Sequence, residues 1–148
     1  MLNGWTFLAW PAFDERWSRL ILAVAKKRAA DPKRYKTSPE ARLLKGLVLV
    51  IRGHIARDPN APAHRLRRDL AAWRRVRFFG RYRLFYRFSS EHRVVVLTWL
   101  NDEHTVRKEG AKSDPYAVFA AMLARGEIPA DWTALVAGSS GLTGPLAE

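Results

Sequence analysis

The run from Trp73 to Leu100 restricts the fold more than any other part of the sequence. It reads WRRVRFFGRYRLFYRFSSEHRVVVLTWL and is rich in the aromatic and β-branched residues that favour strands. A turn at Phe79-Gly80 divides its first half, so the run predicts three consecutive antiparallel strands. Between Trp73 and Phe88 there are six arginines and no carboxylate, so the segment cannot neutralise its own positive potential.

Side chains on a strand alternate between its two faces, so the spacing in this run predicts which residues share a face. The two expected sets are Tyr82, Leu84, Tyr86 and Phe88 on one face, and Arg81, Arg83, Phe85 and Arg87 on the other. We expect the first set to pack on a core and the second to display guanidinium groups between aromatic rings. Guanidinium groups bind phosphate oxygens and rings stack on unpaired bases, so the second face is typical of RNA binding.

Helical patterns flank the predicted sheet. Apolar residues at three- and four-residue spacing predict a helix over about 11–30, after a short strand within 2–10. A second helix is expected over about 37–58, and a shorter one begins near Asp114; both carry capping residues followed by proline. The element order is therefore β-α-α-β-β-β-α. This is an α+β fold in which an N-terminal strand and a two-helix hairpin pack on a small, mostly antiparallel sheet.

Composition bounds the number of domains and the kinds of site. The chain has 148 residues, 48% of them hydrophobic, which is enough for one core, so we expect a single domain over residues 1–137. Residues 138–148 have little apolar content and are expected to be disordered. The absence of cysteine excludes disulfides and thiolate metal sites, and no histidines and carboxylates have convincing metal spacing.

The charge balance predicts the chemistry of the partner. Lys and Arg outnumber Asp and Glu by 26 to 14, giving a formal net charge of +12, so we expect a polyanionic partner. That partner could be nucleic acid, an acidic protein or an anionic membrane. A membrane is the least favoured, because the longest apolar runs fall far short of the roughly 20 residues that a spanning helix needs. Because the N-terminus has no secretory signal pattern, a cytoplasmic location is expected.

Four sequence blocks identify a family. They are NGW at 3–5, FGRYRLFYR at 79–87, WLNDEHTVR at 99–107 and KSDPYAVFAAMLARGEIPADW at 112–132. Through these blocks the chain resembles the YhaV family of toxins in bacterial type II toxin–antitoxin systems, within the wider RelE-like group of small ribonucleases. The resemblance covers nearly the whole chain, and the predicted element order agrees with a RelE-like fold.

The resemblance implies a function and a set of partners. It implies metal-independent endonucleolytic cleavage of mRNA, free or bound to a ribosome, which inhibits translation and requires no cofactor. The implied partner is a PrlF-type antitoxin with an AbrB-like DNA-binding domain, and operator DNA is contacted only through the complex with that antitoxin. No membrane partner is implied.

The resemblance also carries over site positions. The family's basic residues on the strand that enters the hairpin correspond to Arg75 and Arg77, and the arginine of the Tyr-Arg-Leu motif corresponds to Arg83. Further polar groups correspond to residues 102–108. The chain departs from the family at Glu109, where YhaV relatives have a tyrosine, so a tyrosine-assisted step is not available from that position.

Metal-independent cleavage of RNA needs a base for the 2′-hydroxyl, cations for the charge that develops on phosphorus, and an acid for the 5′-oxygen. Arg75 and Arg83 are our candidates for the cations, since a guanidinium rarely releases a proton. His104 and Asp102 are the candidates for proton transfer, because they follow a strand end and could point over the basic face. Alternatively, His104 is an exposed residue in the first turn of a helix that Asp102 caps.

The remaining candidates are expected to hold the RNA. They are Arg77, Arg81, Arg87, Arg107 and Lys108 as phosphate contacts, and Phe85 as a ring that stacks on a base. The alternative for the arginines is a solvated strand face, or a surface that binds only the antitoxin. Two other functions therefore stay open, namely a non-catalytic RNA- or ribosome-binding module and a co-regulator that acts in complex with the antitoxin. His64 and His92, in a loop and a turn, are expected to be ordinary surface residues.

Overall fold

The computed structural model describes residues 1–102 and 114–147. Its helices are α1 (Pro11–Ala30), α2 (Pro39–Val50), α3 (Pro115–Ala124) and α4 (Trp132–Ala137). Its strands are β1 (Thr6–Ala9), β2 (Arg74–Phe78), β3 (Tyr82–Ser89), β4 (Val94–Leu100) and β5 (Ser140–Gly141). The α+β class and the predicted order of elements are confirmed as far as α3, and the C-terminal part adds α4 and β5.

The five strands form one sheet in the order β2-β3-β4-β1-β5. The pairing of β1 with β4 is parallel and the other pairings are antiparallel, so the sheet is mostly antiparallel as predicted. Strand β4 lies in the middle, and Val95, Val96 and Leu97 are fully buried on alternating faces. The nearly all-apolar sequence of β4 thus reflects a strand that is covered on both sides.

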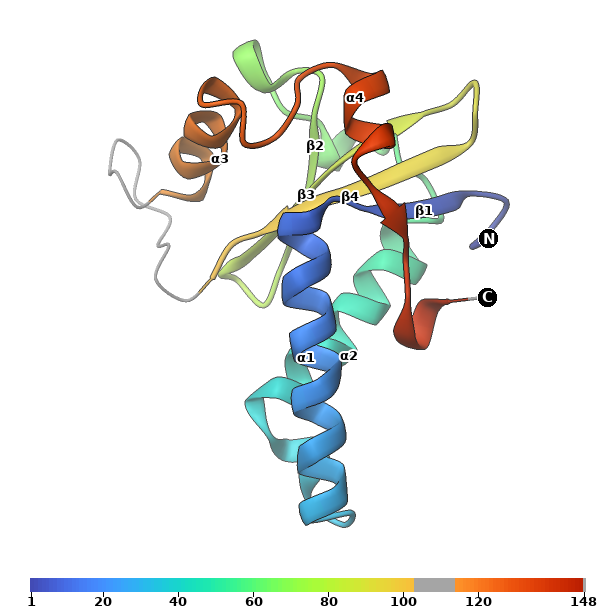
Figure 1. Ribbon diagram of the computed structural model, residues 1–148, viewed down its shortest axis with the longest axis vertical. Coiled ribbons are helices and arrows are strands. Elements are labelled where there is room, and N and C mark those ends of the chain that lie inside the picture. Colours follow the sequence, from blue (N-terminus) through green and yellow to red (C-terminus); the bar gives the residue numbers. More distant parts are fainter. Residues whose placement is uncertain (103–113, 148) are drawn as a thin grey trace.

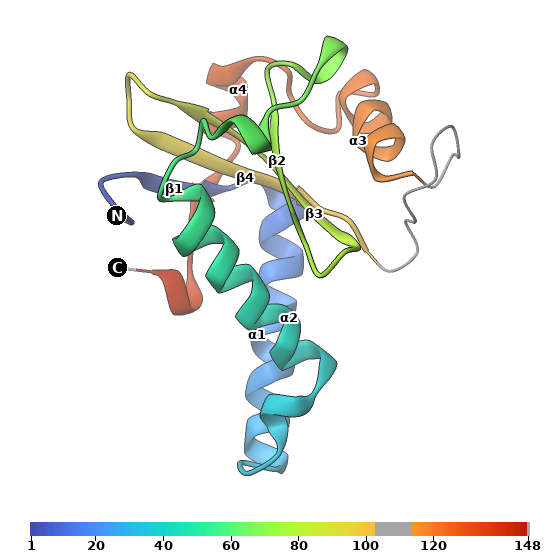
Figure 2. The same ribbon diagram turned by 180° about the vertical axis from the view of Figure 1, so that it is seen from behind.

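The α1–α2 hairpin covers one face of the sheet and extends beyond it, while α3 and α4 lie over the other face (Figures 1 and 2). Helix α2 begins as predicted, with the Ser38 side chain accepting a hydrogen bond from Ala41 N and proline in the next position. Trp17 and Ile51 of the hairpin side pack with Leu84 and Tyr86 of β3 in the first core. The predicted core face of the Tyr82 to Phe88 run is therefore confirmed.

The opposite face of the sheet carries a second core, which the sequence did not predict. Its buried members are Trp73, Phe85, Val96, Phe119, Ile128 and Leu135. The rings of Phe85 and Phe119 stack at 4.3 Å with an interplanar angle of 14°. The prediction of an open face of arginines and aromatic rings is therefore wrong for the centre of this surface. The aromatic side chains of α3 are buried there against the rings of β3 and β4.

The prediction that residues 138–148 are disordered is contradicted for the part that is described. Strand β5 pairs with β1, and Leu142 and Leu146 are buried in the first core. Trp17 Nε1 donates a hydrogen bond to Thr143 O at 2.8 Å. Gly144 has a positive φ of 75° and lies against Ile21 with no room for a Cβ, so glycine suits this turn. Two buried leucines and the hydrogen bond from the Trp17 indole therefore hold residues 140–146 on the first core, although their composition has little apolar content.

The segment between α2 and β2 forms the border of the sheet and corrects the prediction for His64. Its side chain is only 8% exposed, and His64 Nδ1 lies 2.9 Å from Tyr86 Oη. Because the Tyr86 hydroxyl donates to Pro59 O, His64 Nδ1 donates to Tyr86 Oη. Burial lowers the pKa of the His64 imidazole, and His54 and Arg75 lower it further. His64 is thus a neutral residue of the packed border, whereas we expected a surface residue.

This burial makes stability depend on pH. In the unfolded chain His64 titrates near its ordinary pKa of 6.5, whereas the folded chain takes up that proton only at a lower pH. The stabilisation is therefore complete above about pH 6.5 and is lost as the pH falls toward the folded pKa. We expect the free energy of unfolding in urea to decrease from pH 7.5 to 5.5, and to decrease less in His64→Gln, which keeps a side-chain N–H donor. An equal decrease in His64→Gln and wild type would contradict this, and the exposed His92→Gln is the matched control.

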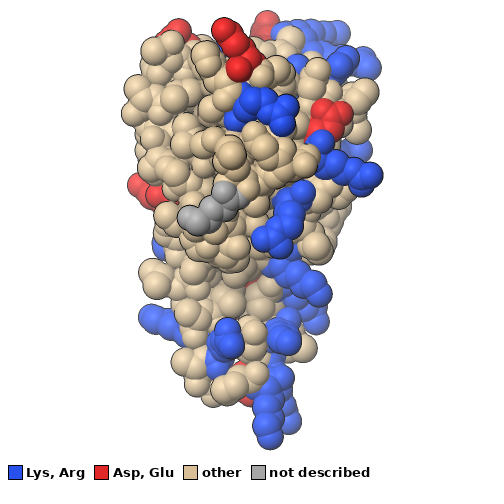
Figure 3. Space-filling view, turned by 90° about the vertical axis from the view of Figure 1, so that its right-hand side faces the viewer, with Lys and Arg blue, Asp and Glu red and all other residues tan. Residues whose placement is uncertain are grey.

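Basic side chains are not confined to the sheet. On the side of the molecule in Figure 3, Lys and Arg extend from the sheet layer down to the tip of the helical hairpin, whereas Asp and Glu lie mostly in the upper part. Within residues 1–102 and 114–147, no helix is both long and apolar enough to cross a bilayer. The positive charge predicted for one strand pair is therefore spread over the helices as well.

Candidate active site

Two of the predicted catalytic arginines converge on one tyrosine. Arg75 Nε in β2 donates to Tyr116 Oη in α3 at 2.9 Å, and Arg83 Nε in β3 donates to the same oxygen at 3.3 Å. Both guanidinium groups also lie over the Tyr116 ring, at 5.9 and 5.6 Å from its centroid. Strands β2 and β3 place the arginines on the same face, since Arg75 pairs with Phe85 and Arg83 pairs with Arg77. We name Arg75, Arg83 and Tyr116 the arginine–tyrosine cluster.

Further contacts fix both guanidinium groups. Arg75 Nη1 donates to Ala63 O at 2.9 Å, and Arg83 Nη1 donates to Arg81 O at 3.2 Å. Arg83 is only 5% exposed, so its guanidinium does not stand on an open surface as the sequence predicted. Charges held in position by such contacts need little reorganisation when negative charge develops beside them.

Asn101 supports the cluster from the end of β4. It is fully buried, and its Oδ1 accepts a hydrogen bond from Arg83 N at 2.6 Å. Its Nδ2 donates to Arg81 O at 3.0 Å, so the amide satisfies two main-chain groups at the start of β3. Asn101 was not among the site residues predicted from the sequence. A polar amide directly after an all-apolar strand was the available signal.

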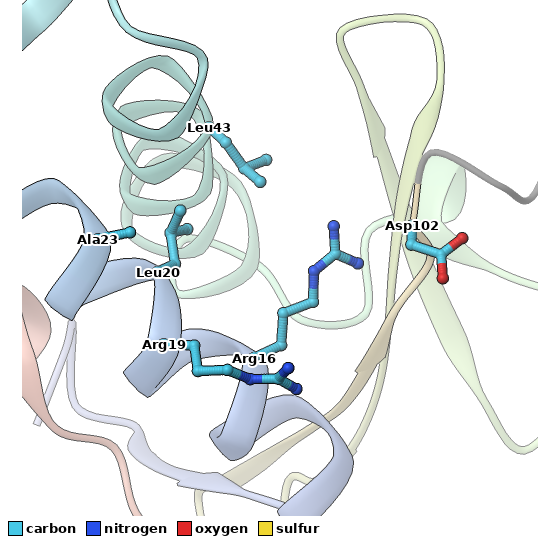
Figure 4. A pocket seen from close by; sticks show the side chains of 6 residues that line it. All are labelled: Arg16, Arg19, Leu20, Ala23, Leu43 and Asp102. Carbon is cyan, nitrogen blue, oxygen red and sulfur yellow. The ribbon is translucent and has the colours of Figure 1, made fainter.

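Arg16 of α1 holds the same strand end from the other face. Its Nη1 donates to the main-chain oxygens of Leu100, at 2.9 Å, and Asn101. Arg16, Arg19 and Asp102 lie around a hollow of about 380 Å³ between the hairpin and the end of β4 (Figure 4). Asp102 therefore lines a hollow beside α1, and its part in proton transfer stays a prediction.

The predicted RNA contacts differ in their surroundings. Arg77 is exposed directly opposite Arg83 in the β2–β3 register. Arg81 is also exposed, but its guanidinium lies over the Tyr82 ring, at 5.3 Å from the centroid. Phe85 is fully buried among Trp99, Tyr116 and Phe119, so it cannot stack on a base. Two further predicted contacts, Arg107 and Lys108, lie outside the described residues, as do the proton-transfer candidate His104 and Glu109.

Arg87 has a structural environment that was not predicted. Its guanidinium lies over the rings of Trp73 and Trp132, at 5.6 and 5.8 Å from their centroids, and Nη1 donates to Ala130 O. Burial lowers the pKa of the Arg87 guanidinium, and Asp131 partly opposes this. Four residues of strand separate Arg87 from Arg83, a distance of about 13 Å. Arg87 therefore ties the segment before α4 to the sheet and lies apart from the arginine–tyrosine cluster.

Tyr116 is the site residue that sequence reasoning missed. Its ring packs edge-on against Phe85 at 5.7 Å, as the ring of a core residue does. The hydroxyl, however, reaches the two arginines. Within residues 1–102 and 114–147, no three His, Asp or Glu side chains gather in a way that could hold a metal ion.

Comparisons with known proteins identify relatives of this chain. A family model described as a toxin with endonuclease activity, of a toxin–antitoxin system, matches residues 7–140. The chain is 41% identical over 140 residues to the ribonuclease toxin YhaV of Escherichia coli K12 and to the toxin YhaV of Escherichia coli O6:H1; each match covers 90% of this chain and 91% of the relative. A solved chain of the toxin–antitoxin complex RelBE2 from Mycobacterium tuberculosis is 35% identical with a TM-score of 0.37, and the match covers 47% of this chain and 76% of that one.

The family model and the similar relatives define an endonuclease toxin of a toxin–antitoxin system. The chain belongs to the YhaV toxin family. The resemblance predicted from the four sequence blocks is thereby confirmed.

Proposed function

We propose that this toxin cleaves mRNA, free or on the ribosome, without a metal ion, and so inhibits translation in the cytoplasm. Assignment to RNA is supported by the relative from Escherichia coli K12, which is named a ribonuclease toxin, and by the formal net charge of +12. The observation that carries the proposal is the Tyr116 hydroxyl held by the Nε donors of both Arg75 and Arg83.

In the proposed reaction the ribose 2′-oxygen attacks the adjacent phosphorus and the bond from phosphorus to the 5′-oxygen breaks. A base takes the proton of the 2′-hydroxyl, and an acid gives a proton to the departing 5′-oxygen. Arg75 and Arg83 stabilise the extra negative charge on the phosphate oxygens in between. The products are a 2′,3′-cyclic phosphate and a 5′-hydroxyl.

Tyr116 is the proposed proton-transfer group among the described residues. Because its oxygen accepts hydrogen bonds from both arginines, its own proton is directed away from them. A phenol in that position can exchange a proton with a ribose oxygen at the cluster. His104 stays a proposal for the second proton-transfer group, and Arg77, Arg81, Arg107 and Lys108 for phosphate contacts.

One observation favours a different function, a non-catalytic RNA-binding module. Arg83 is only 5% exposed, so little of its side chain is open to contact with a phosphate. In that case exposed groups such as Arg77 and Arg81 would bind RNA without turnover.

A toxin–antitoxin system implies an antitoxin partner. We propose that the antitoxin is of the PrlF type with an AbrB-like DNA-binding domain, and that this chain meets operator DNA only within the complex. Copurification of the toxin with such an antitoxin, and binding of the operator by the complex but not by the toxin, would support both statements.

RNA cleavage and non-catalytic RNA binding are distinguished by incubating the toxin in EDTA with free RNA and with RNA on ribosomes. Cleavage is expected, with 2′,3′-cyclic phosphate ends. The matched control Arg34→Ala removes one arginine from the connection between α1 and α2 and should cleave at the wild-type rate. If wild-type toxin binds RNA but leaves it intact in both settings, the binding module is the correct function.

A further inference from the structure

The hydrogen-bond ladder between β3 and β4 ends on a side chain. Continued by one residue, the register that pairs Leu84 with Leu100 places Asn101 opposite Arg83. Asn101 N donates to Arg83 O at 3.4 Å, and in a hydrogen-bonded antiparallel pair the return bond runs from Arg83 N to the main-chain oxygen of Asn101. Here Arg83 N donates to the side-chain Oδ1 of Asn101 instead, at 2.6 Å. The Asn101 side chain has therefore taken the place of its own carbonyl in the ladder.

The main-chain oxygen of Asn101 is bound to another element. Arg16 Nη1 of α1 donates to this oxygen and to Leu100 O, so the end of β4 is held against the helix. With that oxygen bound to α1, the acceptor that Arg83 N needs is supplied by the Asn101 side chain.

The same carboxamide carries the ladder one step further. Asn101 Nδ2 donates to Arg81 O at 3.0 Å, so Oδ1 and Nδ2 bind the two main-chain groups that flank Tyr82. A carboxamide can do this because it presents an acceptor and a donor on one planar group, as a peptide bond does. Asn101 is fully buried and Arg83 is only 5% exposed, so water has little access to replace these bonds.

The oxygen of Arg81 joins Asn101 to the arginine–tyrosine cluster. Besides Asn101 Nδ2, it accepts a hydrogen bond from Arg83 Nη1 at 3.2 Å. A carbonyl oxygen has two lone pairs, so it can accept from both donors. Asn101 thus holds the main-chain N–H of Arg83 directly, and it holds the oxygen that fixes the Arg83 guanidinium. The Nε of that guanidinium donates to Tyr116 Oη.

We propose that Asn101 is a positioning residue of the endonuclease, which acts on the reaction only through Arg83. This inference rests on the proposed role of Arg83 in the cleavage of RNA. When the Arg81 oxygen is not held in place, the long Arg83 side chain can adopt other rotamers, and fewer molecules have the charge in position beside the phosphate. The alternative is a structural role, in which Asn101 only supports the end of the sheet.

A double-mutant cycle distinguishes positioning from structural support. The single-turnover rate of RNA cleavage in EDTA, at saturating toxin, is measured for wild type, Asn101→Ala, Arg83→Ala and the double variant. Asn101→Ala is expected to cleave at least about tenfold more slowly than wild type, but at most about twofold more slowly when Arg83 is already alanine. The affinity for RNA is expected to stay within about twofold of wild type, because a fully buried side chain does not contact RNA.

Two further variants guard against a general effect on the fold. Asn101→Asp keeps an acceptor for Arg83 N and loses only the donor to Arg81 O, so it enters the same cycle if Asn101→Ala unfolds. It is expected to show the same dependence on Arg83. Thr98→Val is the matched control, because Thr98 is equally buried on the same strand and its hydroxyl donates to Val96 O. Thr98→Val is expected to cleave RNA at the wild-type rate, and circular dichroism confirms folding throughout.

Three results overturn the positioning role while the role of Arg83 stands. The first is a wild-type rate in both Asn101 variants. The second is an equal loss of rate in the wild-type and Arg83→Ala backgrounds, and the third is unfolding of both Asn101 variants; each of these leaves Asn101 with a structural role at most. Failure of the proposed function has a different signature, because Arg83→Ala would then cleave at the wild-type rate and Asn101 would have no reacting group to position.

Discussion

Arg83→Ala and Arg75→Ala are each expected to lower the single-turnover rate of RNA cleavage by about 10²- to 10³-fold. Each change removes one of the two guanidinium groups that donate to Tyr116 Oη, and with it a positive charge positioned beside the reacting phosphate. The rate is measured with toxin in excess over a labelled RNA in EDTA, so that binding and product release do not limit it.

Two further variants make this result specific. Arg83→Lys keeps the charge but loses the Nε donor and the planar fork, so it is expected to recover little of the rate. Arg34→Ala loses an arginine at the far end of the hairpin and is expected to match wild type. If Arg75→Ala and Arg83→Ala cleave RNA at the rate of Arg34→Ala, the arginines belong to a binding surface and take no part in the reaction.

Phe85→Ala is expected to lower the free energy of unfolding by about 3–5 kcal/mol, because it empties the centre of the second core. The Phe85 ring is fully buried and stacks on the Phe119 ring, with 4.3 Å between the ring centroids. The centroid of the Trp99 ring lies 5.6 Å from that of Phe85. Urea denaturation at pH 7.5 measures the change, and loss of RNA affinity should follow only from unfolding.

Phe79→Ala is the matched control for Phe85→Ala. The Phe79 ring is 60% exposed and belongs to neither core, so its removal is expected to change the free energy of unfolding by no more than about 0.5 kcal/mol. A folded Phe85→Ala protein with normal stability and weakened RNA binding would restore the stacking role predicted from the sequence.

Much of the fold follows from local sequence patterns. The alternation in Tyr82 to Phe88 identified the face that packs on the hairpin, because strand periodicity is a local property. What covers the other face is not local. Phe119 and Ile128 follow Phe85 by more than thirty residues of chain, and only their packing reveals that they close over it.

The site was predicted in part for the same reason. Arg75 and Arg83 lie together because they are diagonal neighbours on paired strands. The family resemblance indicated both arginines, but the register that joins them comes from the structure. Tyr116 was missed because an apolar helix pattern does not reveal that the hydroxyl of one ring reaches two arginines on another layer. Arg87 follows a tyrosine on the same strand, as Arg83 does, but its guanidinium lies over the rings of Trp73 and Trp132.

The most direct test of the central claim is the single-turnover cleavage rate of Tyr116→Phe in EDTA. Phenylalanine keeps the ring that packs on Phe85 and removes only the hydroxyl held by Arg75 and Arg83, so the fold and the RNA affinity should not change. The account predicts a rate about 10²-fold below wild type, as expected for loss of a proton-transfer group. A Tyr116→Phe toxin that cleaves RNA as fast as wild type would contradict the assignment of the active site to this cluster.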